Sequence, residues 1–179
     1  LLPLRFSAPD GGSAVCAPGF NEELFFGWME EFQPTWYTAV PTMHQAVLKR
    51  AADNRGIVAA RPLRLIRSCS ASLPPQLMAD LEKAFDTPVV EAYGMTEACH
   101  QISINPLPPL ARKPKSVGLP SGVQAAIMDD KGGLLPAGSV GEIVIKGKNV
   151  THGYDNNPAA NAAAFTDGWF RTGDQGYID

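Results

Sequence analysis

The chain has 179 residues, of which 45% are hydrophobic and 18% charged, and its net charge is −3. This length fits one domain or slightly more, and the composition supplies enough apolar side chains for a folded core. The mild acidity gives no support to nucleic-acid binding, which usually shows a basic patch, and no stretch is long and apolar enough to cross a membrane.

The first half of the sequence alternates strand patterns with helix patterns. Runs of β-branched and aromatic residues predict buried strands over 34–40, 64–69 and 88–93. Apolar residues at helical spacing predict helices over Glu22–Phe32, over 42–53 and from a cap at Ser72 to Phe85. This alternation predicts an α/β fold with a mostly parallel sheet and flanking helices. The apolar positions that recur along one helix face are Leu24, Trp28 and Phe32 in the first helix, and Leu77, Leu81 and Phe85 in the third.

The second half has a different texture. Prolines and basic residues over 106–115 predict a stiff connector. Strand patterns at 123–129 and 141–147, separated by glycine and proline turns, predict a partial antiparallel β-barrel. Asn157 is expected to cap one short helix that interrupts these strands. The expected organisation is therefore a partial α/β subdomain at 1–115 and a partial barrel subdomain at 116–179.

The cysteines and histidines exclude several common kinds of site. Cys16, Cys69 and Cys99 are odd in number and widely spaced, which argues against a disulfide framework and favours a reducing, intracellular setting. Burial is expected for all three thiols. No His-Glu-x-x-His, Cys-x-x-Cys or Gly-x-Ser-x-Gly occurs, and no Gly-x-Gly-x-x-Gly follows a strand. A zinc site, a nucleophile elbow and a dinucleotide fold therefore have no support.

One stretch carries an unusual concentration of functional groups. The sequence E-A-Y-G-M-T-E-A-C-H, at 91–100, follows directly on the third predicted strand. Ligands bind at the carboxyl ends of strands in open α/β sheets. A neutral turn needs only Gly, Asn or Asp, whereas this stretch holds an aromatic ring, a Thr-Glu pair and an imidazole. The position and the residue types favour a binding loop.

Three motifs in order resemble the adenylate-forming superfamily, and within it the acyl-CoA synthetases. They are Y-G-M-T-E at 93–97, G-E-I-V-I-K-G at 141–147 and W-F-R-T-G-D at 169–174. E-A-Y-G-M-T-E-A-C-H, N-P-L-P-P and N-N-P-A-A-N are most similar to the oxalate–CoA ligases of the coumarate-ligase branch. The resemblance covers nearly the whole chain and implies a fragment of the large N-terminal domain of such an enzyme.

The resemblance implies ATP, Mg²⁺ and coenzyme A as cofactors and a small carboxylic acid as substrate. The acid would attack the α-phosphate of ATP to give an acyl-adenylate, and the thiol of coenzyme A would then displace AMP. No nucleic-acid or membrane partner is expected, and the oligomeric state stays open. The expected location is the cytoplasm, or the peroxisome in a eukaryote.

By resemblance, Glu97 would ligate Mg²⁺ and Thr96 would donate its hydroxyl to the α-phosphate, which makes these two the expected catalytic residues. Tyr93 would cover one face of the adenine and Asp174 would accept hydrogen bonds from the ribose hydroxyls. Gly94 would let the backbone approach the acyl-phosphate linkage.

Further nucleotide contacts are implied on both sides of the adenine. Glu91 would accept from the adenine amino group. Ser72 could equally serve only as a helix cap. The other residues expected at the nucleotide are Ser70, Ala71, Ala92 and Met95.

Two histidines are expected at the substrate pocket. His100 would lie on the pocket floor, where an imidazole could hold the second carboxylate of oxalate, and the alternative is a half-buried histidine with internal partners. His44 would pack on a helix face near the pocket, with ligand contact as the alternative. A ligase for aromatic or medium-chain fatty acids and a non-catalytic nucleotide-binding module also stay open.

The family's phosphate-binding loop is expected before Leu1, and its lid, which carries a lysine, after Asp179. The chain alone is therefore expected to be inactive.

Overall fold

The computed structural model describes residues 4–7 and 11–179. The chain folds into two compact units, Leu1–Val90 and Glu91–Asp179. The expected subdomain boundary between 115 and 116 stays a prediction, because a compact unit and a family subdomain need not end at the same residue.

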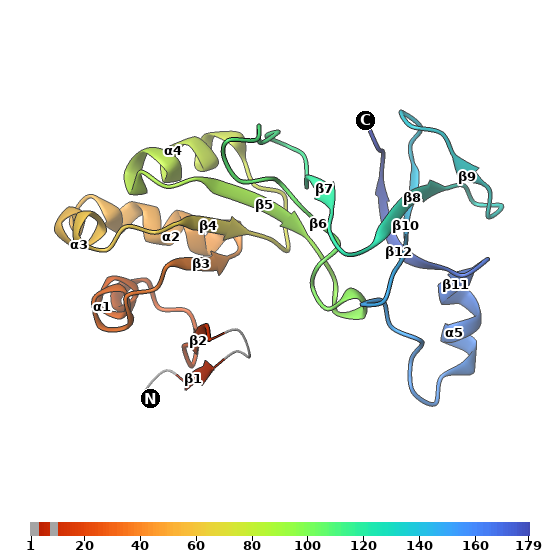
Figure 1. The fold of residues 1–179 in the computed structure, drawn as a ribbon, viewed down its shortest axis with the longest axis horizontal. Coiled ribbons are helices and arrows are strands. Elements are labelled where there is room, and N and C mark those ends of the chain that lie inside the picture. The colour runs from red at the N-terminus through yellow and green to blue at the C-terminus, as the bar shows by residue number, and fades with distance from the viewer. Residues whose placement is uncertain (1–3, 8–10) are drawn as a thin grey trace. The chain divides into compact units, whose positions relative to one another are not determined.

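The first unit has the α/β arrangement that its sequence predicts. β3 and β4 pair in parallel from Trp36 opposite Leu65 to Ala39 opposite Ser68. The start of β5 follows, since Ile66 N–H donates to the carbonyl of Pro88 at 2.9 Å. Figure 1 shows α2 and α4 beside these strands. The elements are β1 (Leu4–Ser7), β2 (Ser13–Cys16), α1 (Glu22–Phe32), β3 (Trp36–Ala39), α2 (Pro41–Ala51), α3 (Arg55–Ala60), β4 (Leu65–Ser68), α4 (Pro75–Phe85) and β5 (Val89–Tyr93).

The core of this unit lies between the helices and the strands. Leu77, Leu81 and Phe85 of α4 are buried, as their spacing predicts. Phe85 stacks on Phe26 of α1 at 6.4 Å between ring centroids. The other fully enclosed side chains of this core include Met29, Val47, Ile66, Leu73 and Val89.

Two local predictions in this unit are wrong. Leu24 is 51% exposed, and Phe26 and Met29 form the buried face of α1. Apolar residues cover a broad arc of this helix, so their spacing alone does not select the inward face. Ser72 is exposed and does not cap α4, which begins at Pro75 after an extended Pro74. A proline at the first helical position has no N–H to satisfy, so this helix start needs less capping.

The cysteines also differ from expectation. Cys16 and Cys99 are exposed, and Cys69 is partly exposed. All three are free thiols.

The second unit is dominated by an antiparallel sheet, as predicted for part of a barrel. Its five strands lie in the order β11-β12-β10-β8-β9. The end of β5 pairs antiparallel with β6, and β6 with β7. Figure 1 shows α5 beside β11. The elements are η1 (Thr96–Ala98), β6 (Ser103–Ile104), β7 (Leu119–Pro120), β8 (Gln124–Met128), β9 (Leu134–Leu135), β10 (Gly141–Lys146), α5 (Pro158–Ala164), β11 (Phe165–Thr166) and β12 (Trp169–Gly176).

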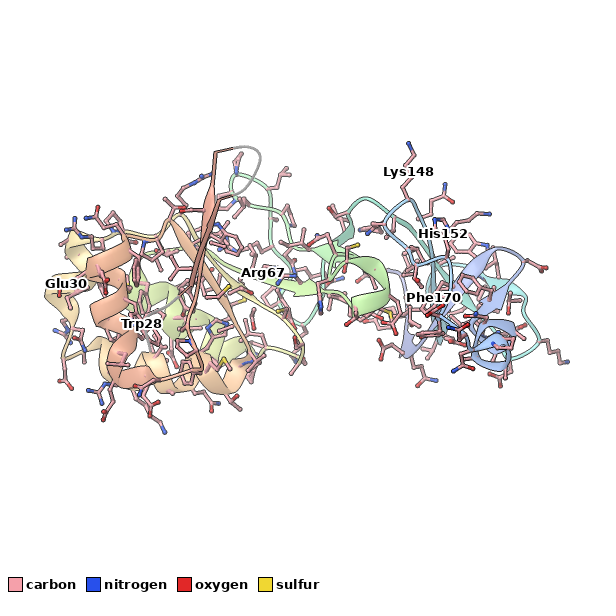
Figure 2. The ribbon with its side chains drawn as sticks, turned by 90° about the horizontal axis from the view of Figure 1, so that it is seen from below. Trp28, Glu30, Arg67, Lys148, His152 and Phe170 are labelled. Carbon is pink, nitrogen blue, oxygen red and sulfur yellow. The ribbon has the colours of Figure 1, made fainter. Side chains whose placement is uncertain are left out.

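The core of the second unit anchors the loop that follows β5. Ala98 of η1 is fully buried in a cluster with Ile145 and Phe170. Figure 2 shows Phe170 within the unit and Lys148 pointing away from it. Asn157 caps α5, because its side-chain oxygen accepts from Ala160 N–H at 3.1 Å, as predicted. Ala98 after the Thr96–Glu97 pair is buried, and the partly buried Tyr93 and Met95 before it pack against the same cluster, which fixes the position of the pair.

Across residues 4–7 and 11–179, the longest helices fall short of the length and apolar character that a bilayer requires.

Candidate functional site

The loop after β5 is closed by its own backbone. His100 N–H donates to the carbonyl of Met95 at 2.9 Å, and Ile102 N–H donates to the carbonyl of Tyr93 at 3.0 Å. Cys99 and His100 both adopt left-handed backbone angles, with φ of 52° and 56°. Side chains rarely take this conformation twice in succession, so the surrounding contacts must hold the loop in place.

Gly94 is required by this closure. A Cβ built on Gly94 would lie 2.3 Å from the carbonyl oxygen of His100. The fold of the chain itself therefore accounts for the glycine. The expected close approach of its backbone to a ligand stays a prediction.

The segment after β10 holds the other side of the loop. Asn149 donates from its side-chain nitrogen to the carbonyls of Ala98 and Gln101, at 3.1 and 2.9 Å. Thr151 N–H donates to the carbonyl of Glu97 at 2.7 Å. Three hydrogen bonds from one short segment thus support the backbone that carries the Thr-Glu pair.

A bulge in β12 presents Asp174. Glu142 and Val144 of β10 pair with Gln175 and Arg171 of β12, so four steps along β12 face two along β10. Gly173 takes a φ of +76° within the extra stretch, a conformation that favours glycine. Bulges of this kind redirect a side chain and are frequent near active sites.

The neighbours of Asp174 fix the shape of the bulge. The Thr172 hydroxyl donates to the carbonyl of Ile143 at 2.7 Å and accepts from Asp174 N–H at 3.1 Å. Glu142 accepts from Gly173 N–H at 2.9 Å and pairs with the guanidinium of Arg171. The letters R-T-G-D therefore have local structural roles besides any contact with a ligand.

A hydrogen bond joins two of the three sequence motifs. The Tyr93 phenol donates to Oδ2 of Asp174 at 2.5 Å. Burial first, and then this bond, raises the pKa of Tyr93 above its ordinary value. The residues expected at the adenine and at the ribose therefore lie together in the second unit.

Glu97 has a partner that the sequence reasoning missed. The Tyr154 phenol donates to Oε1 of Glu97 at 2.9 Å, and this bond raises the pKa of Tyr154. Thr96 is exposed beside it. No periodicity links Tyr154 to Glu97, because Glu97 lies in the three-residue helix η1 and Tyr154 lies on a loop. The only sequence signal is that Tyr154 just precedes the Asn157 cap.

The acidic side chains fit a magnesium ion only in combination with a nucleotide. Residues 4–7 and 11–179 hold no cluster of three or more His, Cys, Asp or Glu side chains suited to a metal. Mg²⁺ is commonly held by one or two carboxylates together with substrate phosphates and water. The single Glu97 carboxylate fits that pattern and does not fit a metal site made by protein alone.

The other expected residues of the second unit have varied surroundings. Glu91 and Ala92 are buried, 4% and 3% exposed. Met95 is partly exposed and His100 is exposed. The contacts expected of these four residues with nucleotide or substrate stay predictions.

The expected residues of the first unit fall into two kinds. Ser70, Ala71 and Ser72 are exposed. His44 is fully buried, and its Nδ1 lies 3.1 Å from the Tyr37 hydroxyl. Burial lowers the pKa of His44 to about 4, against smaller opposing effects of nearby carbonyls, so the ring is neutral at pH 7. His44 therefore packs in the core, and its place at a substrate pocket stays a prediction.

A pocket of about 400 Å³ lies at one end of the strands of the antiparallel sheet, where β8 ends and β10 begins. Asp174 is on its wall, whereas Thr96 and Glu97 are not among its lining residues. The carboxylates that line it are Asp129, Asp130, Glu142 and Asp174.

The model of the AMP-binding enzyme family matches residues 7–155. The chain belongs to this AMP-binding enzyme family, which confirms the resemblance drawn from its motifs.

Named relatives sharpen the comparison. The chain is 49% identical over 183 aligned positions to an oxalate–CoA ligase of Arabidopsis thaliana, covering 100% of this chain and 35% of that protein. It is 47% identical to an oxalate–CoA ligase of Saccharomyces cerevisiae, covering 94% of this chain and 31% of the relative. The chain thus spans about a third of the length of these curated relatives.

A solved structure agrees with the family assignment. The anthranilate–CoA ligase AuaEII in complex with anthranoyl-AMP superposes with a TM-score of 0.83 at 28% sequence identity. The match covers 94% of this chain and 33% of that structure.

Proposed function

We propose that this chain carries the adenylate-binding part of an acyl-CoA ligase that activates a small carboxylic acid. The observation that carries the proposal is the 2.5 Å hydrogen bond between Tyr93 and Asp174. It unites two family motifs in one unit, and the Thr96–Glu97 pair follows Tyr93 by only three residues along the same loop.

The adenosine contacts follow from this pair. The Tyr93 ring stacks on the adenine, a contact that is typically worth about 1–3 kcal/mol. Asp174 accepts from the ribose hydroxyls. A carboxylate offers about four lone-pair sites, so the phenol on Oδ2 leaves acceptor capacity for the sugar. Glu91, Ala92, Gly94 and Met95 complete this side.

The first chemical step joins a carboxylate oxygen of the substrate to the α-phosphorus, and pyrophosphate leaves. Negative charge at the phosphates must be offset by directed donors. The exposed Thr96 hydroxyl donates to the α-phosphate. Mg²⁺, when bound through Glu97, supplies further charge compensation for the phosphates.

The second step forms the thioester. The thiolate of coenzyme A attacks the acyl carbonyl, the bond between this carbon and the phosphate oxygen breaks, and AMP leaves. In this step Asp174 and Tyr93 stay bound to the adenosine of AMP while its bond to the acyl group breaks. The expected contacts of Ser70, Ala71 and Ser72 with the adenine belong to the same proposal.

The leading substrate is oxalate. Two relatives that share 49% and 47% identity are named oxalate–CoA ligases. His100 lies three residues beyond Glu97 and is exposed, and an imidazole can hold the second carboxylate of oxalate by a hydrogen bond. A ligase for aromatic or medium-chain fatty acids is the neighbouring alternative.

The substrate proposal is tested by His100→Ala in the whole enzyme. We expect KM for oxalate to rise about tenfold or more while KM for ATP changes little, because a charge-assisted hydrogen bond to the acid is lost. Equal effects on both substrates would contradict this role of His100. A panel of oxalate, coumarate and octanoate then separates the ligase classes.

Calorimetry on the 179-residue chain tests the nucleotide site itself. An acyl-sulfamoyl adenosine, a non-hydrolysable adenylate mimic, should bind, and Asp174→Asn should weaken it about 10- to 100-fold. Asp155→Asn, at an exposed carboxylate of the same unit, is the matched control. If the two variants bind alike, Asp174 does not hold the ribose. Absence of binding by the unchanged chain would instead favour a fold that has lost the chemistry.

Turnover is a separate matter. The Ser/Thr/Gly-rich phosphate loop and the lid lysine of the family are not found among these 179 residues. We therefore expect the chain to bind an adenylate mimic without forming a thioester, and robust acyl-CoA formation would refute this. An intracellular setting, cytoplasmic or peroxisomal, stays a prediction that the three free thiols support.

A further inference from the structure

Tyr154 is held in place by an asparagine of α5. Its N–H donates to Oδ1 of Asn161 at 2.6 Å, and its carbonyl accepts from the Nδ2 of the same side chain at 2.9 Å. Gly153 lies so close that a Cβ there would come within 2.9 Å of Asn161 Oδ1. The backbone of Tyr154 is therefore fixed on both sides by one amide group.

The same segment also fixes the backbone of Glu97. Thr151 N–H donates to the Glu97 carbonyl at 2.7 Å, and the Thr151 hydroxyl accepts from Gly153 N–H at 3.2 Å. Thr151 and Tyr154 thus contact the main chain and the side chain of a single residue. These two hydrogen bonds from one well-fixed segment restrict both the backbone and the side-chain rotation of Glu97.

The phenol occupies only part of the carboxylate. Tyr154 donates to Oε1 of Glu97, so Oε2 keeps its acceptor capacity. Donors in the outer shell commonly orient carboxylates that ligate metals, and their loss typically lowers metal affinity about 10- to 100-fold. Glu97 is the one residue of its loop to which the proposed function gives a metal.

We propose that Tyr154 is a positioning residue, which orients the Glu97 carboxylate toward the divalent cation of a bound nucleotide. This inference rests on the proposed function, since that function places the cation at Glu97. Tyr154 acts through Glu97 and touches neither the nucleotide nor the substrate.

The inference is tested by the affinity of the chain for ATP with Mn²⁺, and for ATP in excess EDTA. Water-proton relaxation follows the manganese complex, and calorimetry follows the metal-free nucleotide. Because Tyr154 is 39% exposed, water competes for its bond and the effect should lie at the low end of the range. Tyr154→Phe should weaken binding of the manganese complex about tenfold and leave metal-free ATP unchanged.

Tyr177→Phe is the matched control, because Tyr177 is a 62% exposed tyrosine of the same unit. It should alter neither affinity. Asn161→Ala, which removes the brace, should shift the manganese complex in the same direction as Tyr154→Phe. A Tyr154→Phe effect of equal size with and without metal would overturn the inference, since it would mark a general loss of structure.

A double-mutant cycle separates this inference from the function on which it rests. In a Glu97→Gln background, Tyr154→Phe should cause no further loss, because its route through the carboxylate is gone. Additive losses would overturn the positioning role alone. If Glu97→Gln itself leaves manganese dependence intact, or the unchanged chain binds no nucleotide, the proposed function fails and the role of Tyr154 fails with it.

Discussion

The candidate residues of the two units differ in what holds them. In the second unit, polar side chains are joined across long stretches of sequence, as in Tyr93–Asp174 and Glu97–Tyr154, and they stay partly open to solvent. In the first unit, His44 is sealed in the core. The contrast teaches that a polar residue noticed in a sequence has two common fates. His44 supports folding from within the core, whereas Asp174 and Glu97 are hydrogen-bonded and still accessible to a ligand.

The largest effect on stability is expected from the core of the second unit, which supports the Tyr93–Asp174 and Glu97–Tyr154 pairs. Phe170 is 1% exposed and meets Phe165 edge-on at 5.3 Å between ring centroids. Phe170→Ala should lower the free energy of unfolding by about 3–5 kcal/mol, because it opens a large cavity. Urea unfolding measures this loss, and Phe20→Ala, at a residue 41% exposed, should cost far less. Equal losses would mean that the second unit does not depend on this core.

The sealed histidine should make folding sensitive to acid. The pKa of His44 is lowered from 6.5 to about 4, so the unfolded chain takes up this proton first as pH falls. The corresponding stability is fully present above pH 6.5 and is lost progressively toward pH 4. It amounts to about 3 kcal/mol.

His44→Gln should flatten the unfolding free energy across that pH interval, as measured by urea titration at successive pH values. His152→Gln, at an exposed histidine, should keep the slope of the unchanged chain. An unchanged slope in His44→Gln would show that His44 is not the titrating group. That result would also contradict the conclusion that His44 supports folding from within the core of the first unit.

A smaller effect is expected where the loop closes on Gly94. Gly94→Ala must push aside the backbone of His100, and such overpacking typically costs about 1–3 kcal/mol. Gly27→Ala is the matched control, because no atom lies within 4 Å of the added Cβ and an alanine in a helix is favourable. Gly94→Ala should therefore lower the unfolding midpoint while Gly27→Ala leaves it equal or higher. The reverse order would mean that the loop does not fold back as described.

Regular elements could be predicted because their signals are local. The spacing of Leu77, Leu81 and Phe85 defines the buried face of α4, and Asn157 caps α5. The face of α1 could not be predicted, since apolar residues cover a broad arc of that helix. β6 and β7 have two residues each, which is too short for any period to show.

The candidate site was only partly predictable for a similar reason. Motif letters were enough to nominate Tyr93, Glu97 and Asp174. The bond from Tyr154 to Glu97 joins a loop residue to a three-residue helix 57 positions away, and neither segment is long enough to show a periodic pattern. The resemblance suggested Ser72 as a nucleotide contact, and its place before a helix pattern suggested a cap. The start of α4 at Pro75, without a side-chain cap, excludes the cap.

The bulge in β12 lets one strand both pair with β10 and present Asp174. Regular pairing with β10 continues on both sides of it, at Gln175 and Gly176 and again at Arg171 and Phe170. Asp174 is not one of the paired residues, whereas Thr172 and Gly173 bond to Ile143 and Glu142 of β10. A change confined to the Asp174 side chain should therefore leave the pairing of β10 with β12 intact on both sides of the bulge.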